Sequence, residues 1–238
     1  MTTSKRSAVV AAWLVHALSA SMIVMGVLAL FAVERGAWRT ALLWLALSLL
    51  VDGVDGPLAR AARVREVLPT IDGGTLDLVV DYVTFVFVPA VLIDRVHVIP
   101  APWSLVAVSA ILVSALYHYA RTDLKTPDRY FNGFPAFWNV VAFYLVLWHP
   151  LAPISFGVVA LFAALTFAPV QFVHPLRVRE HRGLLFAAIA VWTLSNVVLL
   201  LALGDGPANP WLLGCSAAAA AVLLGLGFLR TLRGSARG

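Results

Sequence analysis

The chain has 238 residues, of which 61% are hydrophobic and only 12% are charged, and its mean hydropathy is +0.91. Soluble domains carry about twice that share of charged residues, so the composition excludes an ordinary soluble domain and a disordered chain. The net charge of +5 comes from short basic clusters between apolar runs. That pattern is typical of loops facing lipid headgroups and does not favour a nucleic-acid partner.

Eight apolar runs predict an all-α protein, a polytopic bundle of transmembrane helices that forms one domain over residues 1–238. Several runs reach the roughly 20 residues that a helix needs to cross a bilayer. The second run is short, and we expect it to continue through residues 52–60. The predicted spans are Ala8–Val33, Trp38–Val51, Leu76–Ile93, Trp103–Ala120, Phe134–Trp148, Ile154–Val173, Leu184–Leu203 and Trp211–Leu229.

The basic residues predict the orientation of these spans. Of the 17 Lys and Arg residues, all but Arg35, Arg39 and Arg95 fall near the two termini or in every second loop. Cytoplasmic loops carry such an excess of Lys and Arg. Both termini are therefore expected in the cytoplasm, which requires an even number of spans.

Four acidic residues lie at the cytoplasmic ends of the second and third predicted spans. Asp52 and Asp55 close the second span, and Asp77 and Asp81 open the third. Carboxylates at membrane depth are costly, and they usually mark a functional site. The two helices should run in opposite directions, so their acidic ends are expected to meet at one depth.

The spacing of these residues predicts one acidic face on each helix. A helix advances by about 100° per residue. An arc of about 100° on the first helix therefore holds Asp52, Asp55, Gly56 and Ala59. An arc of about 80° on the second holds Gly73, Asp77 and Asp81.

Clustered carboxylates repel one another strongly where the dielectric constant is low, and bound cations remove that repulsion. A set of oxygen ligands suits hard ions such as Mg²⁺, Mn²⁺ or Ca²⁺. No Cys/His set with zinc spacing is present, and the six histidines form no constellation in the sequence.

Small residues accompany the acidic residues, and Arg60 follows them. Gly53, Gly56 and Ala59 leave room for a ligand beside the carboxylates, although small residues also favour close helix packing in membranes. Arg60 suits a charge-assisted contact with a carboxylate or phosphate. The alternative is that it is one more basic residue of a cytoplasmic loop.

Together these residues read Asp52-x-x-Asp55-Gly56-x-x-Ala59-Arg60, followed by Gly73-x-x-x-Asp77-x-x-x-Asp81. This string resembles the signature of the CDP-alcohol phosphotransferase family. The twelve residues between Arg60 and Gly73 exceed the usual spacing of that signature.

The resemblance implies a role for each signature residue. It implies that Asp52, Asp55, Asp77 and Asp81 hold two divalent ions, Mn²⁺ or Mg²⁺, and that Asp81 is also the catalytic base. The residues implied to bind the CDP group are Asp52, Gly56, Ala59, Arg60 and Gly73. Dimers are common in the family, so a homodimer is one expectation of the resemblance.

Longer stretches are similar to the branch of that family that makes phosphatidylcholine in bacteria. They are Asp55–Arg60, Val64–Pro69, Thr75–Thr84 and Asn132–Asn139. This likeness implies an enzyme of the bacterial inner membrane, with its site on the cytoplasmic side, that joins CDP-diacylglycerol to choline and releases CMP. A quaternary ammonium binds to aromatic faces. Candidate aromatic side chains are Tyr82, Phe85, Tyr117 and Tyr119.

Three other functions stay open at this point. A related enzyme could use serine, inositol or glycerol phosphate as acceptor, although evenly spread arginines favour an acceptor without phosphate. Intramembrane prenyltransferases also bind metal and diphosphate through Asp-rich helices. A cation transporter is the non-enzyme alternative, although such proteins often contain internal repeats and none is found here.

Overall fold

The computed structural model describes residues 3–124, 126, 130–174 and 181–234. Residues 3–5 are described by their backbone alone. The basic residues outside these ranges are Lys125, Arg129, Arg177, Arg179 and Arg237. Their contribution to the predicted orientation therefore lies beyond the described part of the chain, and the orientation of the termini stays a prediction.

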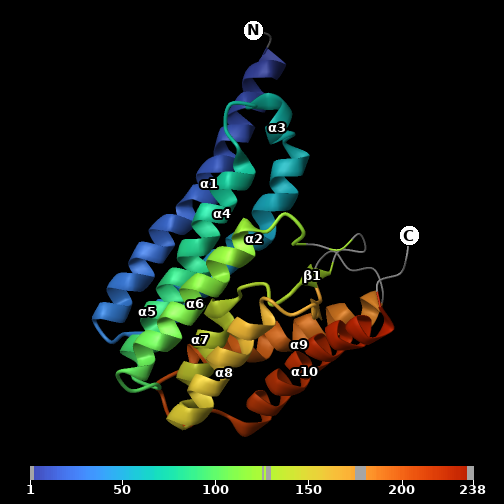
Figure 1. The fold of residues 1–238 in the computed structure, drawn as a ribbon. Helices are drawn as coiled ribbons and strands as arrows, with labels where there is room; N and C mark the ends of the chain where they lie inside the picture. Colours follow the sequence, from blue (N-terminus) through green and yellow to red (C-terminus); the bar gives the residue numbers. More distant parts are fainter. Residues whose placement is uncertain (1–2, 125, 127–129, 175–180, 235–238) are drawn as a thin grey trace. The chain divides into compact units, whose positions relative to one another are not determined.

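Helices make up most of the described structure (Figure 1). In chain order the elements are α1 (Thr3–Glu34), α2 (Trp38–Ala61), α3 (Val64–Val67), α4 (Gly73–Asp81), η1 (Tyr82–Phe87), α5 (Val88–Arg95), α6 (Trp103–Ala120), β1 (Phe131–Asn132), α7 (Trp138–Trp148), α8 (Ala152–Leu165), β2 (Gln171–Phe172), α9 (Arg182–Leu201) and α10 (Pro210–Arg233). The expectation of an all-α protein is confirmed, because the two strands have two residues each.

Six helical segments of the described residues are long and apolar enough to cross a membrane. They are Arg6–Glu34, Trp38–Ala61, Gly73–Arg95, Trp103–Ala120, Arg182–Leu201 and Pro210–Arg233. The segment Trp38–Ala61 confirms that the second apolar run, which is short by itself, continues through residues 52–60. The third consists of α4, η1 and α5 in one continuous rod.

The fifth and sixth predicted spans are shorter than expected, which corrects the count of eight to six helices of spanning length. Helices α7 and α8 have 11 and 14 residues. The chain before α7 is not helical, and Gly133 and Ala136 there have positive φ angles. The N–H of Phe134 donates to the carbonyl of Leu165 at 3.1 Å, which satisfies one of the terminal carbonyls of α8.

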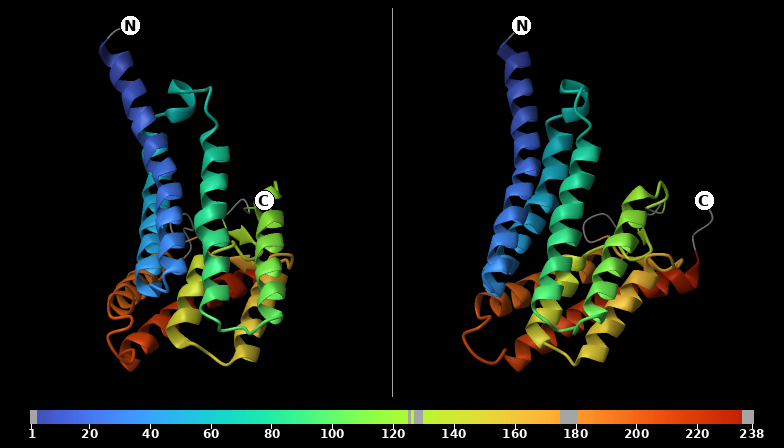
Figure 2. Two further views of the ribbon diagram at one scale, coloured as in Figure 1. Left: turned by 90° about the vertical axis from the view of Figure 1, so that its left-hand side faces the viewer. Right: turned by 60° about the vertical axis from the view of Figure 1, so that its left-hand side comes forward.

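The described residues form two compact units. Unit 1 contains residues up to Val96 together with Trp138–Phe143, and unit 2 contains His97–Phe137 and the chain from Tyr144 onward. In unit 1, α1 contacts α2, α3, α4, η1 and α5. The start of α1, the end of α2 and the start of α4 lie at the same end of this unit (Figures 1 and 2).

The core of unit 1 lies where α1, α2, α4 and η1 meet. Met22, Val51, Val80 and Phe85 are buried there in one apolar cluster. One turn beyond Met22, a Cβ on Gly26 would lie 3.2 Å from Cγ2 of Thr84. The absence of a side chain therefore lets α1 approach η1 closely, as small residues do in membrane helix pairs.

The π-helical segment η1 begins directly after Asp81. The N–H of Val88 donates to the carbonyl of Val83, five residues back. Pro89 follows and has no N–H to offer to the carbonyl of Phe85. The wider π-helical turn thus replaces the α-helical hydrogen bonds, which join residues four apart, just before Pro89. Such segments are frequent at functional sites.

Unit 2 contains a partly buried polar network between α7, α9 and α10. Ser216 Oγ donates to Asn196 Oδ1 at 2.8 Å, and it lies 2.5 Å from the hydroxyl oxygen of Tyr144. Trp192 Nε1 donates to the same tyrosine oxygen at 2.9 Å. Because the proton of Ser216 is used on Asn196, Tyr144 donates to Ser216. Such interhelical hydrogen bonds contribute about 0.6–2 kcal/mol each in membrane proteins.

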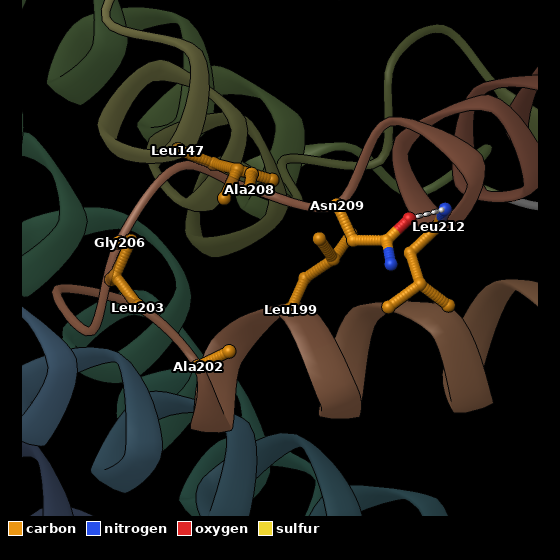
Figure 3. Close-up of a pocket in the computed structure, with 8 residues that line it drawn as sticks. All are labelled: Leu147, Leu199, Ala202, Leu203, Gly206, Ala208, Asn209 and Leu212. Atoms are coloured by element: carbon orange, nitrogen blue, oxygen red, sulfur yellow. Dashed lines mark hydrogen bonds between the residues drawn. The ribbon is translucent and has the colours of Figure 1, made fainter.

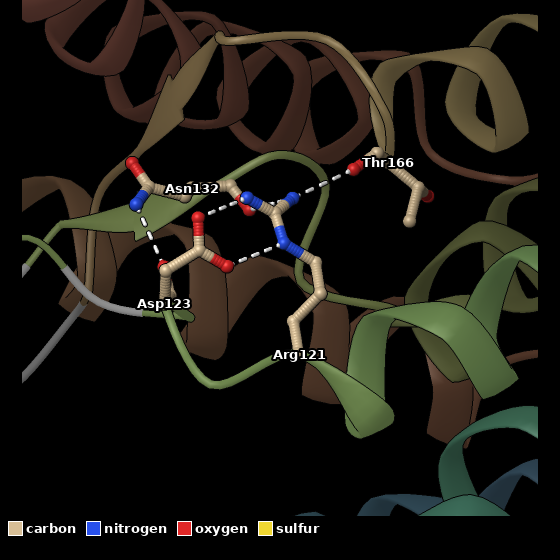
Figure 4. A network of polar contacts seen from close by, with 4 residues as sticks. All are labelled: Arg121, Asp123, Asn132 and Thr166. Carbon is tan, nitrogen blue, oxygen red and sulfur yellow. Dashed lines mark hydrogen bonds and ion pairs between the residues drawn. The ribbon is translucent and has the colours of Figure 1, made fainter.

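A second network in unit 2 surrounds Arg121, the first residue after α6 (Figure 4). Its Nε and Nη2 atoms donate to the two carboxylate oxygens of Asp123 at 2.8 Å each. Its Nη1 atom lies 3.4 Å from the carbonyl of Asn132 and 3.3 Å from that of Thr166. One guanidinium thus joins the ends of α6 and α8 to β1.

Large apolar side chains cover the outside of the helices. Leu14, Leu50, Leu105 and Leu194 are all more than 60% exposed. On a water-soluble protein, exposed apolar surface of this extent would cause aggregation. In a bilayer the same surface faces lipid tails, so helix association depends on packing and on interhelical hydrogen bonds.

We predict that Asp123→Asn changes the acid sensitivity of the protein. The side-chain hydrogen bonds from Arg121 hold the pKa of Asp123 below its usual value of about 3.9. The pair therefore stabilises the fold above that pH, and its contribution is lost as pH falls through the lowered folded-state pKa. Asp123→Asn should reduce the unfolding temperature in detergent at pH 7, and the reduction should be smaller at pH 3, which lies below the unfolded-state pKa of about 3.9.

Glu66→Gln is the control for loss of one exposed carboxylate. If Asp123→Asn lowered the unfolding temperature equally at pH 7 and pH 3, the proposed stabilisation by the ionised Arg121–Asp123 pair would be contradicted.

Candidate metal and substrate site

Three of the four predicted carboxylates converge in unit 1. Asp52 and Asp55 lie one turn apart on α2, and Asp77 lies in the middle of α4. One oxygen of each carboxylate lies within 4.8 Å of an oxygen of the other two. Asp55 is 5% exposed, and the other two are half-buried. Asp81 lies one turn beyond Asp77 and is not a member of this group.

The donor set fits a hard divalent cation. Two unit charges about 4 Å apart repel by roughly 4 kcal/mol at an effective dielectric constant of about 20. Three carboxylates at this spacing therefore need protons, donors or a cation to offset their charge. All three ligand atoms are oxygens, which suits Mg²⁺, Mn²⁺ or Ca²⁺ better than zinc.

Helix α1 adds two buried polar side chains that the sequence analysis did not assign to the site. Ser19 Oγ donates to Asp55 Oδ2 at 2.5 Å, and Ser19 is 8% exposed. His16, one turn earlier, is 6% exposed. A Cβ on Gly73 would lie 3.2 Å from its Cε1 atom. The signal in the sequence was the spacing of three residues between His16 and Ser19, which places both on one face of a largely apolar span.

The end of α2 brings Arg60 back over Gly56. A Cβ on Gly56 would lie 3.5 Å from Nη1 of Arg60, in ordinary van der Waals contact. A longer side chain at position 56 would compete with the guanidinium for this space. Gly53, by contrast, has open space where a Cβ would lie.

The long connection between Arg60 and Gly73 forms a defined structure. It contains the single helical turn α3, and α4 begins at Gly73. Asp72 caps α4 by accepting from Gly74 N–H at 2.9 Å and from the Thr75 hydroxyl at 2.8 Å. The pKa of Asp72 is lowered, chiefly by the Thr75 hydroxyl and then by Gly74 N–H. The extra residues thus supply a turn and a helix cap.

The candidate choline aromatics divide between the two units. Phe85 is 1% exposed and packs in the core of unit 1, whereas Tyr82 in the same unit is half-buried. In unit 2, Tyr117 is 59% exposed and meets the edge of Phe167, and Tyr119 meets His118. Tyr82 therefore combines the proximity to Asp81 and the partial exposure that a choline contact needs.

A small cavity in unit 2, about 80 Å³ in volume, offers no comparable chemistry (Figure 3). Its lining is apolar apart from Asn209. The side-chain oxygen of Asn209 accepts from the N–H groups of Trp211 and Leu212, so it caps α10. The lining contains no titratable group.

Comparisons with known proteins agree with the position of the acidic site. The family described as CDP-alcohol phosphatidyltransferase matches residues 9–170, a range that includes all four aspartates. Similar proteins include a phosphatidylcholine synthase of Pseudomonas aeruginosa, 44% identical over 93% of this chain and 92% of that protein. A second, from Rhizobium meliloti, is 39% identical over 92% of this chain and 90% of that protein. A third, from Legionella pneumophila, is 34% identical over 80% of this chain and 78% of that protein.

The match of the family over more than half of the sequence agrees with the carboxylates that converge from α2 and α4. The chain belongs to the CDP-alcohol phosphatidyltransferase family.

Proposed function

We propose that the protein is a phosphatidylcholine synthase, which transfers the phosphatidyl group of CDP-diacylglycerol to choline and releases CMP. The observation that carries this proposal is the convergence of Asp52, Asp55 and Asp77 within the range matched by the family. The names of relatives that align over most of their length support choline as the acceptor.

The acidic group is proposed to hold divalent metal, Mn²⁺ or Mg²⁺, as two ions. Asp52, Asp55 and Asp77 would be ligands, and Asp81, one turn beyond Asp77, would complete the set. When bound, such ions offset the negative charge of the attacking and leaving oxygens during phosphoryl transfer.

The remaining chemistry is assigned to side chains of unit 1. Asp81 accepts the proton of the choline hydroxyl, because a neutral hydroxyl is a weak nucleophile. The choline oxygen forms a bond to the phosphorus that carries diacylglycerol, and the bond from that phosphorus to CMP breaks. Gly56, Ala59, Arg60 and Gly73 bind the CDP group, and Arg60 suits a diphosphate oxygen.

The site is proposed to face the cytoplasm of a bacterium, at the inner membrane. Arg60, Arg63 and Arg65 lie at the end of unit 1 where α2 ends and α4 begins. A basic cluster at this end agrees with the positive-inside rule. The family resemblance also favours a homodimer, which the mass of the purified protein in detergent would test.

The direct test of the proposed function is an acceptor panel with purified protein in detergent. We expect CDP-diacylglycerol, Mn²⁺ and labelled choline to give phosphatidylcholine and CMP, whereas serine, inositol and glycerol phosphate give no lipid product. Chelation of divalent ions should reduce the product to background, and added Mn²⁺ or Mg²⁺ should restore it. Preference for another acceptor would change the assigned substrate, and activity that survives chelation would reject the metal site.

Asp81→Asn tests the assignment of the base. The amide keeps the shape of the side chain but cannot accept the choline proton, so kcat should fall by about 10²–10⁴-fold. Asp94→Asn is the matched control, because Asp94 lies near the far end of the same helical rod. A near-normal turnover of Asp81→Asn would contradict the role of Asp81.

Tyr82 is proposed to contact the quaternary ammonium of choline. A cation–π contact contributes about 0.5–2 kcal/mol, so Tyr82→Ala should raise the apparent choline constant by about 2- to 30-fold. Tyr82→Phe keeps the ring and should stay near wild type, and the constant for CDP-diacylglycerol should not change. Equal effects of Ala on both substrate constants would argue against this role.

A further inference from the structure

We propose that Ser19 of α1 is a positioning residue for the metal site, because its hydroxyl fixes the orientation of the Asp55 carboxylate. The inference rests on the proposed function, in which Asp55 is a metal ligand. Ser19 lies outside the acidic signature, within the predicted apolar span Ala8–Val33. Its contact with Asp55 joins α1 to α2 through two residues that lie 36 positions apart in the chain.

The geometry favours a strong hydrogen bond. The distance of 2.5 Å between Ser19 Oγ and Asp55 Oδ2 falls within the range for a hydroxyl that donates to an ionised carboxylate. The carbonyl oxygen of Val15 lies 3.4 Å from Ser19 Oγ. Since the hydroxyl has a single proton, the closer and charged acceptor takes it. Both side chains are more than nine-tenths buried, so water does not compete for either group.

The packing of α1 holds Ser19 in this place. Ser19, Met22 and Gly26 follow one another at spacings of three and four residues, so they share one face of the helix. Met22 is buried in the core with Val51, and Gly26 lies against Thr84 of η1. The helix therefore has little freedom to rotate or withdraw, and the hydroxyl is fixed before any ligand binds.

This hydrogen bond has two consequences for the acidic group. It places a donor on one of three carboxylates that repel one another, which reduces the free-energy cost of their convergence. It also restricts rotation of the Asp55 side chain, while Oδ1 and a second lone pair of Oδ2 stay available to a cation. Groups that orient metal ligands in this way typically change metal affinity by 10- to 100-fold when removed.

A purely structural role would have a different effect. If the hydrogen bond only joined α1 to α2, its loss would lower the unfolding temperature without a selective effect on metal binding. Ser21 provides the matched control, since its hydroxyl donates to the Leu18 carbonyl within α1 at 2.6 Å. Both residues lie on the same helix, and Ser19 donates to a carboxylate whereas Ser21 donates to a backbone carbonyl.

The test is Mn²⁺ binding to the purified full-length protein without substrates, measured from the electron paramagnetic resonance signal of free Mn²⁺. Ser19→Ala should weaken Mn²⁺ binding by about 10- to 100-fold, whereas Ser21→Ala should bind as wild type does. Ser19→Thr keeps the hydroxyl and should restore binding to within a few-fold. In turnover assays, Ser19→Ala should raise the Mn²⁺ activation constant and leave the apparent choline constant unchanged.

The outcomes separate this inference from the proposed function. Equal Mn²⁺ binding by wild type, Ser19→Ala and Ser21→Ala would overturn the role of Ser19 and leave the metal site intact. Wild-type protein that binds no Mn²⁺ would overturn both. If Ser19→Ala unfolds, binding by Ser19→Thr and Ser19→Cys decides, because the thiol is a much weaker donor. Wild-type affinity in the cysteine variant would then reject the inference.

Discussion

Mutual repulsion among the carboxylates of Asp52, Asp55 and Asp77 is the constraint that the rest of unit 1 must satisfy. Oxygens of the three groups lie within 4.8 Å of one another at the end of two apolar helices. Their charges would favour separation, so helix packing must hold them together and cations or donors must offset the charge. This combination of fixed geometry and unbalanced charge makes the group suitable for divalent metal.

Helix α1 supplies much of that fixed geometry. It contacts both α2 and α4, the helices that carry the acidic residues, and it also contacts η1 and α5. A single buried face of α1 combines apolar packing through Met22, close approach through Gly26 and a donor through Ser19. The same helix thus supports the fold of unit 1 and the orientation of one carboxylate.

Unit 2 is held by polar groups of a different kind. Arg121 joins the ends of α6 and α8 to β1, and the hydroxyl of Tyr144 connects three helices through Trp192 and Ser216. Neither network has the clustered charge of the acidic group in unit 1. In the Tyr144 network Ser216 and Asn196 are buried, so their polar atoms must be paired, which makes the geometry of that network specific.

The sequence by itself determined the helical class, four of the spanning helices nearly to their ends, and the four aspartates with their spacing. These features depend on local hydropathy and helical periodicity, which are readable along one chain. The sequence overestimated the lengths of the helices at residues 134–148 and 154–173. The reason is that the hydrogen bond from Phe134 to Leu165 and the turn at Gly133 involve residues far apart in sequence.

Only the tertiary structure decided which side chains accompany the acidic group. It placed Ser19 on Asp55 and His16 beside Gly73, and it buried Phe85 in the core while Tyr82 stayed partly exposed. A serine or histidine in an apolar span has many possible partners, and the rotation of α1 against α2 and α4 selects among them. That rotation is set by packing at Met22 and Gly26, which no local pattern in the sequence specifies.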